Sequence, residues 1–226
     1  MKSYELSLYI SAYTKSFIKK IKFSLKGLIY FDKYDKRGDY HWEHYYKRKT
    51  PFYVKLVDTI VSYVPENSHV LDVGCGDGLS AHRIYEEKKS KVTGIDINPL
   101  AVYYARRNNT PNPNKFIEKS ISEFNNNHLF DGAVAVEIFE HIEHPELLLS
   151  KIKCLIKDGG FLIITTPIAD PQRGVARYHY KEYAEDEFLR FLESYGFQTR
   201  EKEYLYNESD GSRIVIVSCV KQMSFT

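Results

Sequence analysis

The feature that most constrains this chain is a glycine-rich turn between a strand-like pattern and a helical one. Residues 70–73 run directly into Gly74, Gly76 and Gly78, and a helical pattern begins at Leu79. Glycines at such a turn let a ligand approach the backbone closely and aim the amino end of the next helix at it. The turn therefore predicts a ligand site at the carboxyl end of a strand.

An acidic residue marks the end of the next predicted strand. Asp96 follows the glycine turn by about 20 residues, where a carboxylate can accept hydrogen bonds from both hydroxyls of a ribose. The G-x-G-x-x-G dinucleotide fingerprint is absent, because Leu79 stands at its third glycine. Asp72 would add negative charge beside a pyrophosphate, whereas it suits a ligand with an amino group and a sulfonium. We expect an adenosine-type cofactor.

From about residue 65 onward, strand-like runs alternate with helical patterns, as is typical of a parallel sheet with helices on both faces. The predicted strands are 70–73, 91–96, 115–118, 132–136, 161–165, 198–205 and 213–220, and the predicted helices are 79–87, 99–108, 145–156 and 186–195. The last two strands predict an antiparallel hairpin on one edge. The expected fold is α/β, Rossmann-like, with a seven-stranded and mostly parallel sheet.

Four segments together resemble the class I S-adenosylmethionine-dependent methyltransferases, and especially the ubiquinone-type and sugar methyltransferases. These segments are residues 70–78, 92–97, 130–141 and 159–167. The resemblance covers residues 52 to 220 and implies that S-adenosyl-L-methionine is the cofactor.

The resemblance also implies a role for each residue around the donor. The amino group of the donor would lie at Asp72, its ribose at Asp96 and its adenine beside Ile97. Relatives often place an acid for the adenine amine where this chain has Ser120 and Ile121, so a serine hydroxyl or the backbone would make that contact. The implied cofactor site comprises Asp72, Gly74, Cys75, Gly76, Asp96, Ile97, Ser120, Ile121 and Glu137.

The expected chemistry needs few catalytic groups. The sulfonium already activates the methyl group, so the protein mainly aligns the nucleophile and excludes water. A general base helps a hydroxyl nucleophile more than an amine. His141 is the predicted base, with Glu137 and His179 as further catalytic candidates. The alternative for His141 is a structural role at the start of the following helix.

A metal site is an open alternative for the same residues. Glu137, Glu140 and His141 are spaced i, i+3, i+4, which puts them on one face of a helix. This spacing resembles the metal site of small-RNA 2′-O-methyltransferases, and His179 could be a fourth ligand. We expect no metal and keep a divalent cation as the alternative.

Two segments supply the predicted acceptor contacts. Arg177 and Tyr183 belong to a segment that resembles the substrate loop before the last helix of ubiquinone-type and sugar methyltransferases. Trp42, Tyr45 and Tyr46 stand in an aromatic cluster where relatives fold a lid over the donor. The alternative for both segments is packing without contact to substrate.

The first 50 residues are predicted to form a helical extension or lid on a methyltransferase domain of residues 51–226. Residues 15–29 carry five lysines and no acid, beside apolar residues at near-helical spacing. Such a segment either lies on an anionic membrane as an amphipathic helix or packs on the domain with its lysines solvated.

Composition narrows the function further. The net charge of +2 provides no strong field for nucleic acid, and the three widely spaced cysteines predict neither disulfides nor a zinc site. A cytoplasmic enzyme is expected, acting on a hydroxyl of a small molecule or glycan precursor. The alternatives are N-methylation of a small amine, with or without a phosphate, and a non-catalytic regulatory protein that binds the donor.

Overall fold

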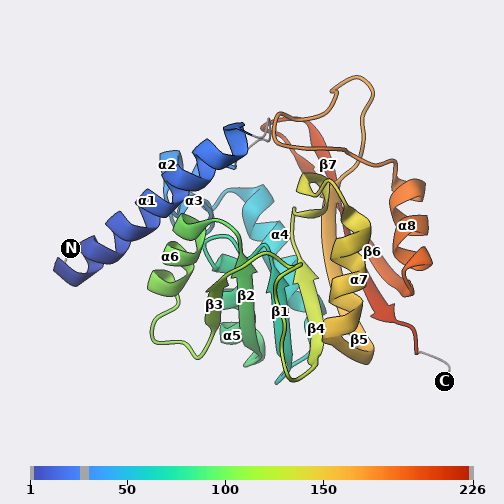
Figure 1. Ribbon diagram of the computed structural model, residues 1–226. Helices are drawn as coiled ribbons and strands as arrows, with labels where there is room; N and C mark the ends of the chain where they lie inside the picture. The colour runs from blue at the N-terminus through green and yellow to red at the C-terminus, as the bar shows by residue number, and fades with distance from the viewer. Residues whose placement is uncertain (1–2, 26–30, 224–226) are drawn as a thin grey trace.

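The protein is built around one seven-stranded sheet in the order β3-β2-β1-β4-β5-β7-β6 (Figure 1). The computed structural model describes residues 3–25 and 31–223. The strands are β1 His69–Val73, β2 Lys91–Asp96, β3 Lys115–Glu118, β4 Phe130–Ala135, β5 Ile156–Pro167, β6 Phe197–Asn207 and β7 Ser212–Lys221. Strands β1 to β5 are parallel, and β7 is antiparallel to both β5 and β6. The predicted fold class is confirmed.

Helices cover both faces of the sheet. They are α1 Ser3–Leu25, α2 Lys33–Arg37, α3 Tyr40–Trp42, η1 Glu43–Lys47, α4 Pro51–Tyr63, α5 Leu79–Lys88, α6 Pro99–Asn108, η2 Phe139–His141, α7 Pro145–Leu155 and α8 Glu185–Ser194. Apolar residues of α7 and α8, such as Leu148 and Phe188, pack on one face. Residues of α4, α5 and α6, such as Ile60, Ile84 and Val102, pack on the other.

Local sequence explains where several helices begin. Proline occupies a first-turn position in α4, α6 and α7, where its fixed φ suits a helix and its missing N–H costs nothing. Asn98 caps α6, because its side-chain oxygen accepts hydrogen bonds from the N–H groups of Leu100 and Ala101 at 2.9 and 3.3 Å.

The fifth strand begins earlier than the sequence predicts. We expected a helix to residue 156, a stop at 158–160 and a strand from 161, but β5 already begins at Ile156. Phe130 of β4 pairs with Ile156, and the register shifts before Gly132. Gly159 has a φ of 71°, so this stretch is an irregular start of the strand.

The N-terminal helices pack beside the sheet, against α6. Tyr34 and Tyr40 share a buried cluster with Leu100, Ala101 and Tyr104 of that helix, and Figure 1 shows α1 crossing over α6. Among the described helices, none combines the length and apolar character needed to cross a bilayer.

Candidate active site

The glycine turn joins β1 to α5 in a conformation that only glycine adopts easily. Gly74, Gly76 and Gly78 have φ values of 73°, 54° and 78°. A Cβ on Gly74 would come within 2.9 Å of the Ile138 side chain, and one on Gly76 would overlap the hydroxyl of Tyr34. The turn thus brings bare backbone to the carboxyl edge of the sheet, where the side chains of Ile138 and Tyr34 lie against it.

Asp72 is the residue at this turn that best suits a cationic ligand. Its side chain is buried, and its Oδ2 has no hydrogen-bond partner among the described residues. Burial and the nearby charge of Asp96 raise the pKa of Asp72 to about 7. A buried carboxylate oxygen without a donor suits a ligand that brings an ammonium group, such as the amino-acid end of the expected cofactor.

Asp96 lies at the end of β2, next to the glycine turn. Its carboxylate accepts hydrogen bonds from the N–H groups of Gly76 at 3.0 Å and Asn98 at 2.7 Å. Burial raises the pKa of Asp96 despite these bonds. The side chain of Ile97 is 45% exposed at the same edge. Ser120 follows β3, the strand whose Glu118 pairs with Asp96, and Ile121 packs on the core.

The carboxyl end of β4 carries two acids, Glu137, which is half-buried, and Glu140, which is buried. Glu137 adopts a φ of 50°, which is strained for a residue with a side chain and recurs at functional sites. Thr165 of β5 holds it, accepting from its N–H at 2.9 Å and donating to Oε1 at 2.8 Å. Burial raises the pKa of Glu137 to about 7. Glu140 is 1% exposed, accepts a hydrogen bond from Thr166 at 3.0 Å, and has a pKa raised well above its usual range by burial.

Two histidines lie beside Glu140 with their rings 4.9 Å apart. Nδ1 of His141 lies 2.8 Å from the carbonyl oxygen of Tyr178, and Nδ1 of His179 lies 2.7 Å from Oε1 of Glu182. One ligand atom each of Glu140, His141 and His179 lies within 4.8 Å of the others. The structure therefore groups three of the four residues named in the metal alternative, while Glu137 is held by Thr165.

Residues 31–42, here called the lid segment, cover this edge of the sheet. The carbonyl of Phe31 accepts a hydrogen bond from Asn98 at 3.0 Å, and its ring lies 5.4 Å from that of His141. At the other end of the segment, His41 donates its N–H to Asp77 at 3.1 Å, and the indole of Trp42 donates to the Asp77 carbonyl at 2.9 Å. The lid segment is thereby attached at both ends.

The lid segment also meets the loop before α8. Tyr178 donates its hydroxyl to Asp32 at 2.9 Å. The ammonium of Lys33 lies 5.1 Å from the ring of Phe31 and 5.9 Å from that of Tyr178. The pKa of Lys33 is lowered, because the effect of burial outweighs the attraction to Glu137 and other acids. Phe31, Lys33 and Tyr34 are not among the residues predicted from the sequence, where their signal is the density of aromatic residues in this stretch.

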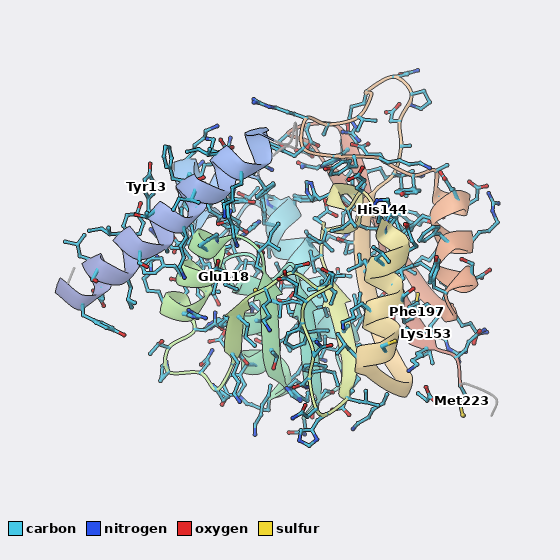
Figure 2. All side chains as sticks on the ribbon, in the orientation of Figure 1. Tyr13, Glu118, His144, Lys153, Phe197 and Met223 are labelled. Atoms are coloured by element: carbon cyan, nitrogen blue, oxygen red, sulfur yellow. The ribbon has the colours of Figure 1, made fainter. Side chains whose placement is uncertain are left out.

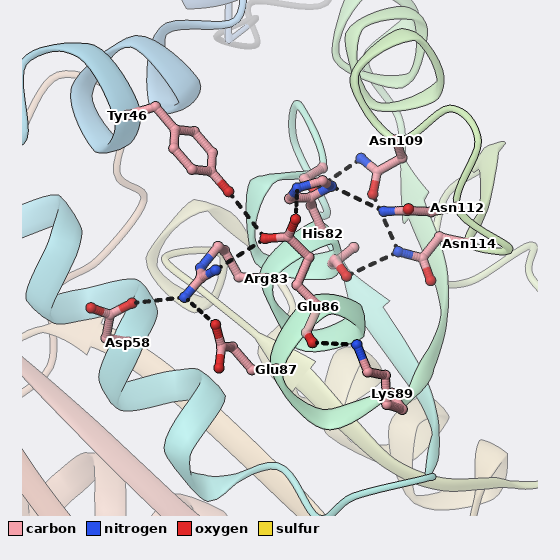
Figure 3. A network of polar contacts seen from close by, with 12 residues as sticks. Tyr46, Asp58, His82, Arg83, Glu86, Glu87, Lys89, Asn109, Asn112 and Asn114 are labelled. Atoms are coloured by element: carbon pink, nitrogen blue, oxygen red, sulfur yellow. Dashed lines mark hydrogen bonds and ion pairs between the residues drawn. The ribbon is translucent and has the colours of Figure 1, made fainter.

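Of the three aromatic residues predicted as pocket walls, Trp42 contacts the glycine turn through Asp77, whereas Tyr45 and Tyr46 have their polar contacts elsewhere. Tyr45 donates to Asp58 of α4 at 2.5 Å, and Tyr46 donates to Glu86 of α5 at 3.4 Å, within the network of Figure 3. The ring of Trp42 lies 4.7 Å from that of His82 on α5. The structure thus brings Tyr34, rather than Tyr45 or Tyr46, over the glycine turn, because η1 turns those rings toward α4 and α5.

The other two predicted acceptor residues differ in exposure. Arg177 is exposed, with its guanidinium 5.6 Å from the ring of Tyr178. Tyr183 is buried, and its ring packs 5.1 Å from that of Phe139 in the core under α8. The contacts of Tyr183 are those of a residue that anchors the loop.

Known proteins resemble the chain in sequence. A family model described as "Methyltransferase domain" matches residues 41–202. The mitochondrial ubiquinone biosynthesis O-methyltransferase of Dictyostelium discoideum is 29% identical over 114 residues, which are 45% of this chain and 36% of that protein. The tRNA U34 carboxymethyltransferase of Pseudoalteromonas atlantica is 26% identical over 161 residues, which are 70% of this chain and 46% of that protein. The chain spans less than half the length of these relatives.

Solved structures share the fold. The Burkholderia thailandensis 1,6-didemethyltoxoflavin-N1-methyltransferase, solved with S-adenosylhomocysteine, has a TM-score of 0.65 and 18% identity over 83% of this chain and 87% of its own. The [4+2]-cyclase SpnF has a TM-score of 0.65 and 16% identity over 76% of this chain and 82% of its own. The family match covers most of the chain and the fold agrees with it, so the chain belongs to the methyltransferase domain family and is a class I S-adenosylmethionine-dependent methyltransferase.

Proposed function

We propose that the protein transfers a methyl group from S-adenosylmethionine to a hydroxyl of a small molecule or glycan precursor. The observation that carries the proposal is the contact between His141 Nδ1 and the carbonyl oxygen of Tyr178. A carbonyl only accepts hydrogen bonds, so Nδ1 carries the proton and Nε2 keeps a lone pair. Burial lowers the pKa of His141 to about 4, so the ring is neutral near pH 7 and can accept a proton.

A weak base is sufficient for this reaction. The bond between sulfur and the methyl carbon breaks while the acceptor oxygen bonds to that carbon, and the hydroxyl proton remains on the oxygen. An alkylated hydroxyl is strongly acidic, so it readily gives its proton to Nε2 of a histidine with a pKa of about 4. An amine acceptor needs only to arrive uncharged, and it would make little use of His141.

The imidazole of His179 has the same hydrogen-bonding pattern as that of His141. Its Nδ1 donates to the buried carboxylate of Glu182, so its Nε2 also keeps a free lone pair. The T-shaped contact of the His141 and His179 rings supports a role for His179 in orienting the acceptor hydroxyl. We assign His141 as the base and His179 as a residue that positions the acceptor.

The donor would lie over the glycine turn. The unpartnered oxygen of Asp72 supports its contact with the donor amino group, and the position of Asp96 at the end of β2 supports a ribose contact. Glu137 follows β4, the strand that pairs with β1. The adenine contacts of Ile97, Ser120 and Ile121 rest on their place at the edge of β2 and β3.

Among the relatives named above, the ubiquinone biosynthesis O-methyltransferase supports a hydroxyl acceptor. A phenol is therefore the first acceptor class to test, followed by sugars. Two other functions remain as test outcomes: N-methylation of an amine, and donor binding without turnover. The [4+2]-cyclase with the same fold illustrates that the fold alone does not select the reaction.

The test combines one variant with an acceptor panel. Purified protein is incubated with S-adenosylmethionine and with phenols, sugars or amines, and methylated products are detected by mass spectrometry. We expect products from a hydroxyl acceptor. His141→Gln should lower their turnover by roughly 100-fold or more while S-adenosylhomocysteine binds as in the wild type.

Three outcomes would overturn the assignment. Unchanged turnover in His141→Gln would leave the histidine a structural role. Methylation of amines alone would replace the hydroxyl acceptor. Loss of turnover on treatment with EDTA, restored by Mn²⁺ or Mg²⁺, would assign the group of Glu140, His141 and His179 to a cation instead of a base.

A further inference from the structure

The outward face of α1 is apolar, and no other part of the described chain covers it. Leu6, Ile10, Tyr13, Phe17 and Ile21 recur every three or four residues and form one line along the helix, here called the α1 stripe. Their exposed fractions are 45%, 55%, 46%, 56% and 45%. In Figure 2, Tyr13 lies on the side of α1 that faces away from the sheet. A solvated helix face is normally polar, so the α1 stripe indicates a binding surface.

The opposite face of α1 holds the helix in this orientation. Ala12 and Ser16 are buried against the body of the protein. Lys15 and Lys19 reach Glu118 of β3 at 3.3 and 2.9 Å. Because both the apolar and the charged contacts of α1 are made on this inner face, rotation of the helix could not hide the stripe without breaking them.

We propose that the α1 stripe docks the protein on an anionic lipid bilayer. Residues 6–31 contain no Asp or Glu, but they contain five lysines. Of these, Lys20 and Lys22 are exposed and lie on either side of the stripe, and Lys20 also pairs with Asp32 at 2.8 Å. Apart from Glu5 in its first turn, α1 carries only basic charge. A helix with an apolar face and such a charge lies in the headgroup region of an anionic membrane, where the lysines contact the lipids.

A second copy of the chain fits this surface less well. The stripe is about 22 Å long on a helix about 10 Å wide, roughly 200 Å², whereas a stable interface needs about 800 Å² from each partner. Two lysine-rich helices side by side would also repel each other. A bilayer has no such size requirement and carries the complementary charge.

The sequence analysis considered a membrane contact for residues 15–29. The structure shifts the contact surface toward the N-terminus, to residues 6–21, and residues 26–29 lie outside the described part of the chain. The docking proposal does not depend on the acceptor or on the role of His141, and it can be tested without turnover.

The test is co-sedimentation of the full chain with vesicles of phosphatidylcholine, with and without phosphatidylserine, at low and high salt. The disrupting variant combines Ile10→Ser with Phe17→Ser, both on the exposed face. The matched control combines Leu147→Ser with Tyr206→Ser, which are 58% and 64% exposed on other elements. Binding of S-adenosylhomocysteine should be unchanged in both, which reports an intact fold.

We expect the wild type and the control to bind vesicles that contain phosphatidylserine, more weakly at high salt, and the stripe variant to bind at least about tenfold more weakly. Equal binding of the stripe variant and the wild type would overturn the proposal, as would no binding by the wild type. A lipid-free dimer that the stripe variant converts to a monomer would assign the surface to a second copy.

Discussion

The donor side and the acceptor side of the site are built in different ways. The donor side consists of one turn, with its acid at the end of the adjacent strand, and its backbone is fixed by bonds from Gly74 and Cys75 to the Ile95 carbonyl at 2.9 and 3.0 Å. The acceptor side combines residues 137–141, the loop before α8 and the lid segment. In the proposed site, donor recognition is thus local in sequence, whereas acceptor recognition is distributed and can change without altering the sheet.

Asp72→Asn should give the largest effect and should be confined to the donor side. Loss of the charged contact is expected to weaken S-adenosylhomocysteine binding by about 100-fold in calorimetry. Since the pKa of Asp72 is raised to about 7 by burial, wild-type affinity should rise from pH 6 to pH 8 as the carboxylate deprotonates. The variant should lack this rise. A change of less than about threefold would show that Asp72 does not hold the donor.

Glu137→Gln tests whether burial of the carboxyl group at the end of β4 costs stability. Burial raises the pKa of Glu137 to about 7, so the folded state binds the proton more tightly than the unfolded state does. The stability that this tighter proton binding contributes is fully present below about pH 4.5 and is lost as pH rises through 7. In urea unfolding, the variant should gain about 2 kcal/mol relative to the wild type between pH 4.5 and pH 8. The same substitution at exposed Glu143 is the control, and equal pH profiles would contradict the prediction.

Lys33→Met should separate the two sides in the opposite sense to Asp72→Asn. The ammonium on the lid segment attracts Glu137 and Glu140, so its loss should lower kcat/KM for the acceptor by about tenfold. Binding of S-adenosylhomocysteine should stay within about twofold. Lys47→Met, on an exposed turn of η1, should change neither quantity. A fall in donor affinity as large as the fall in kcat/KM would show that Lys33 acts on the donor side as well as on the acceptor side.

Tyr178→Phe should have the smallest effect. It removes the hydroxyl that donates to Asp32 and joins the lid segment to the loop before α8. A hydrogen bond to a charged group contributes about 1.5–3 kcal/mol, but Lys20 and Lys36 still hold Asp32 in the variant, so bound S-adenosylhomocysteine should dissociate only several-fold faster in stopped-flow displacement. Tyr180→Phe, at an exposed neighbouring ring, is the control. Equal dissociation rates in both variants would show that this bond does not hold the lid segment.

The contrast also explains what the sequence could predict. Strand patterns, glycines and the acid after β2 are local signals, and the sheet, its hairpin and the donor turn followed from them. The grouping of His141 with His179 depended on a loop whose path no periodicity reveals. The position of Tyr34 over Gly76 depended on how α2 packs against α6, and that of Tyr45 and Tyr46 against α4 and α5 depended on how η1 turns; residue type alone determines neither.

Asn98 limits how this protein can vary. Its side-chain oxygen caps α6, its amide nitrogen donates to the Phe31 carbonyl, and its backbone N–H donates to Asp96. Aspartate would keep the cap, lose the bond to the lid segment and place a second carboxylate beside Asp96; serine would keep only the cap. Position 98 therefore has little mutational freedom, and substitutions that reshape the lid are more readily accommodated at positions that serve a single contact.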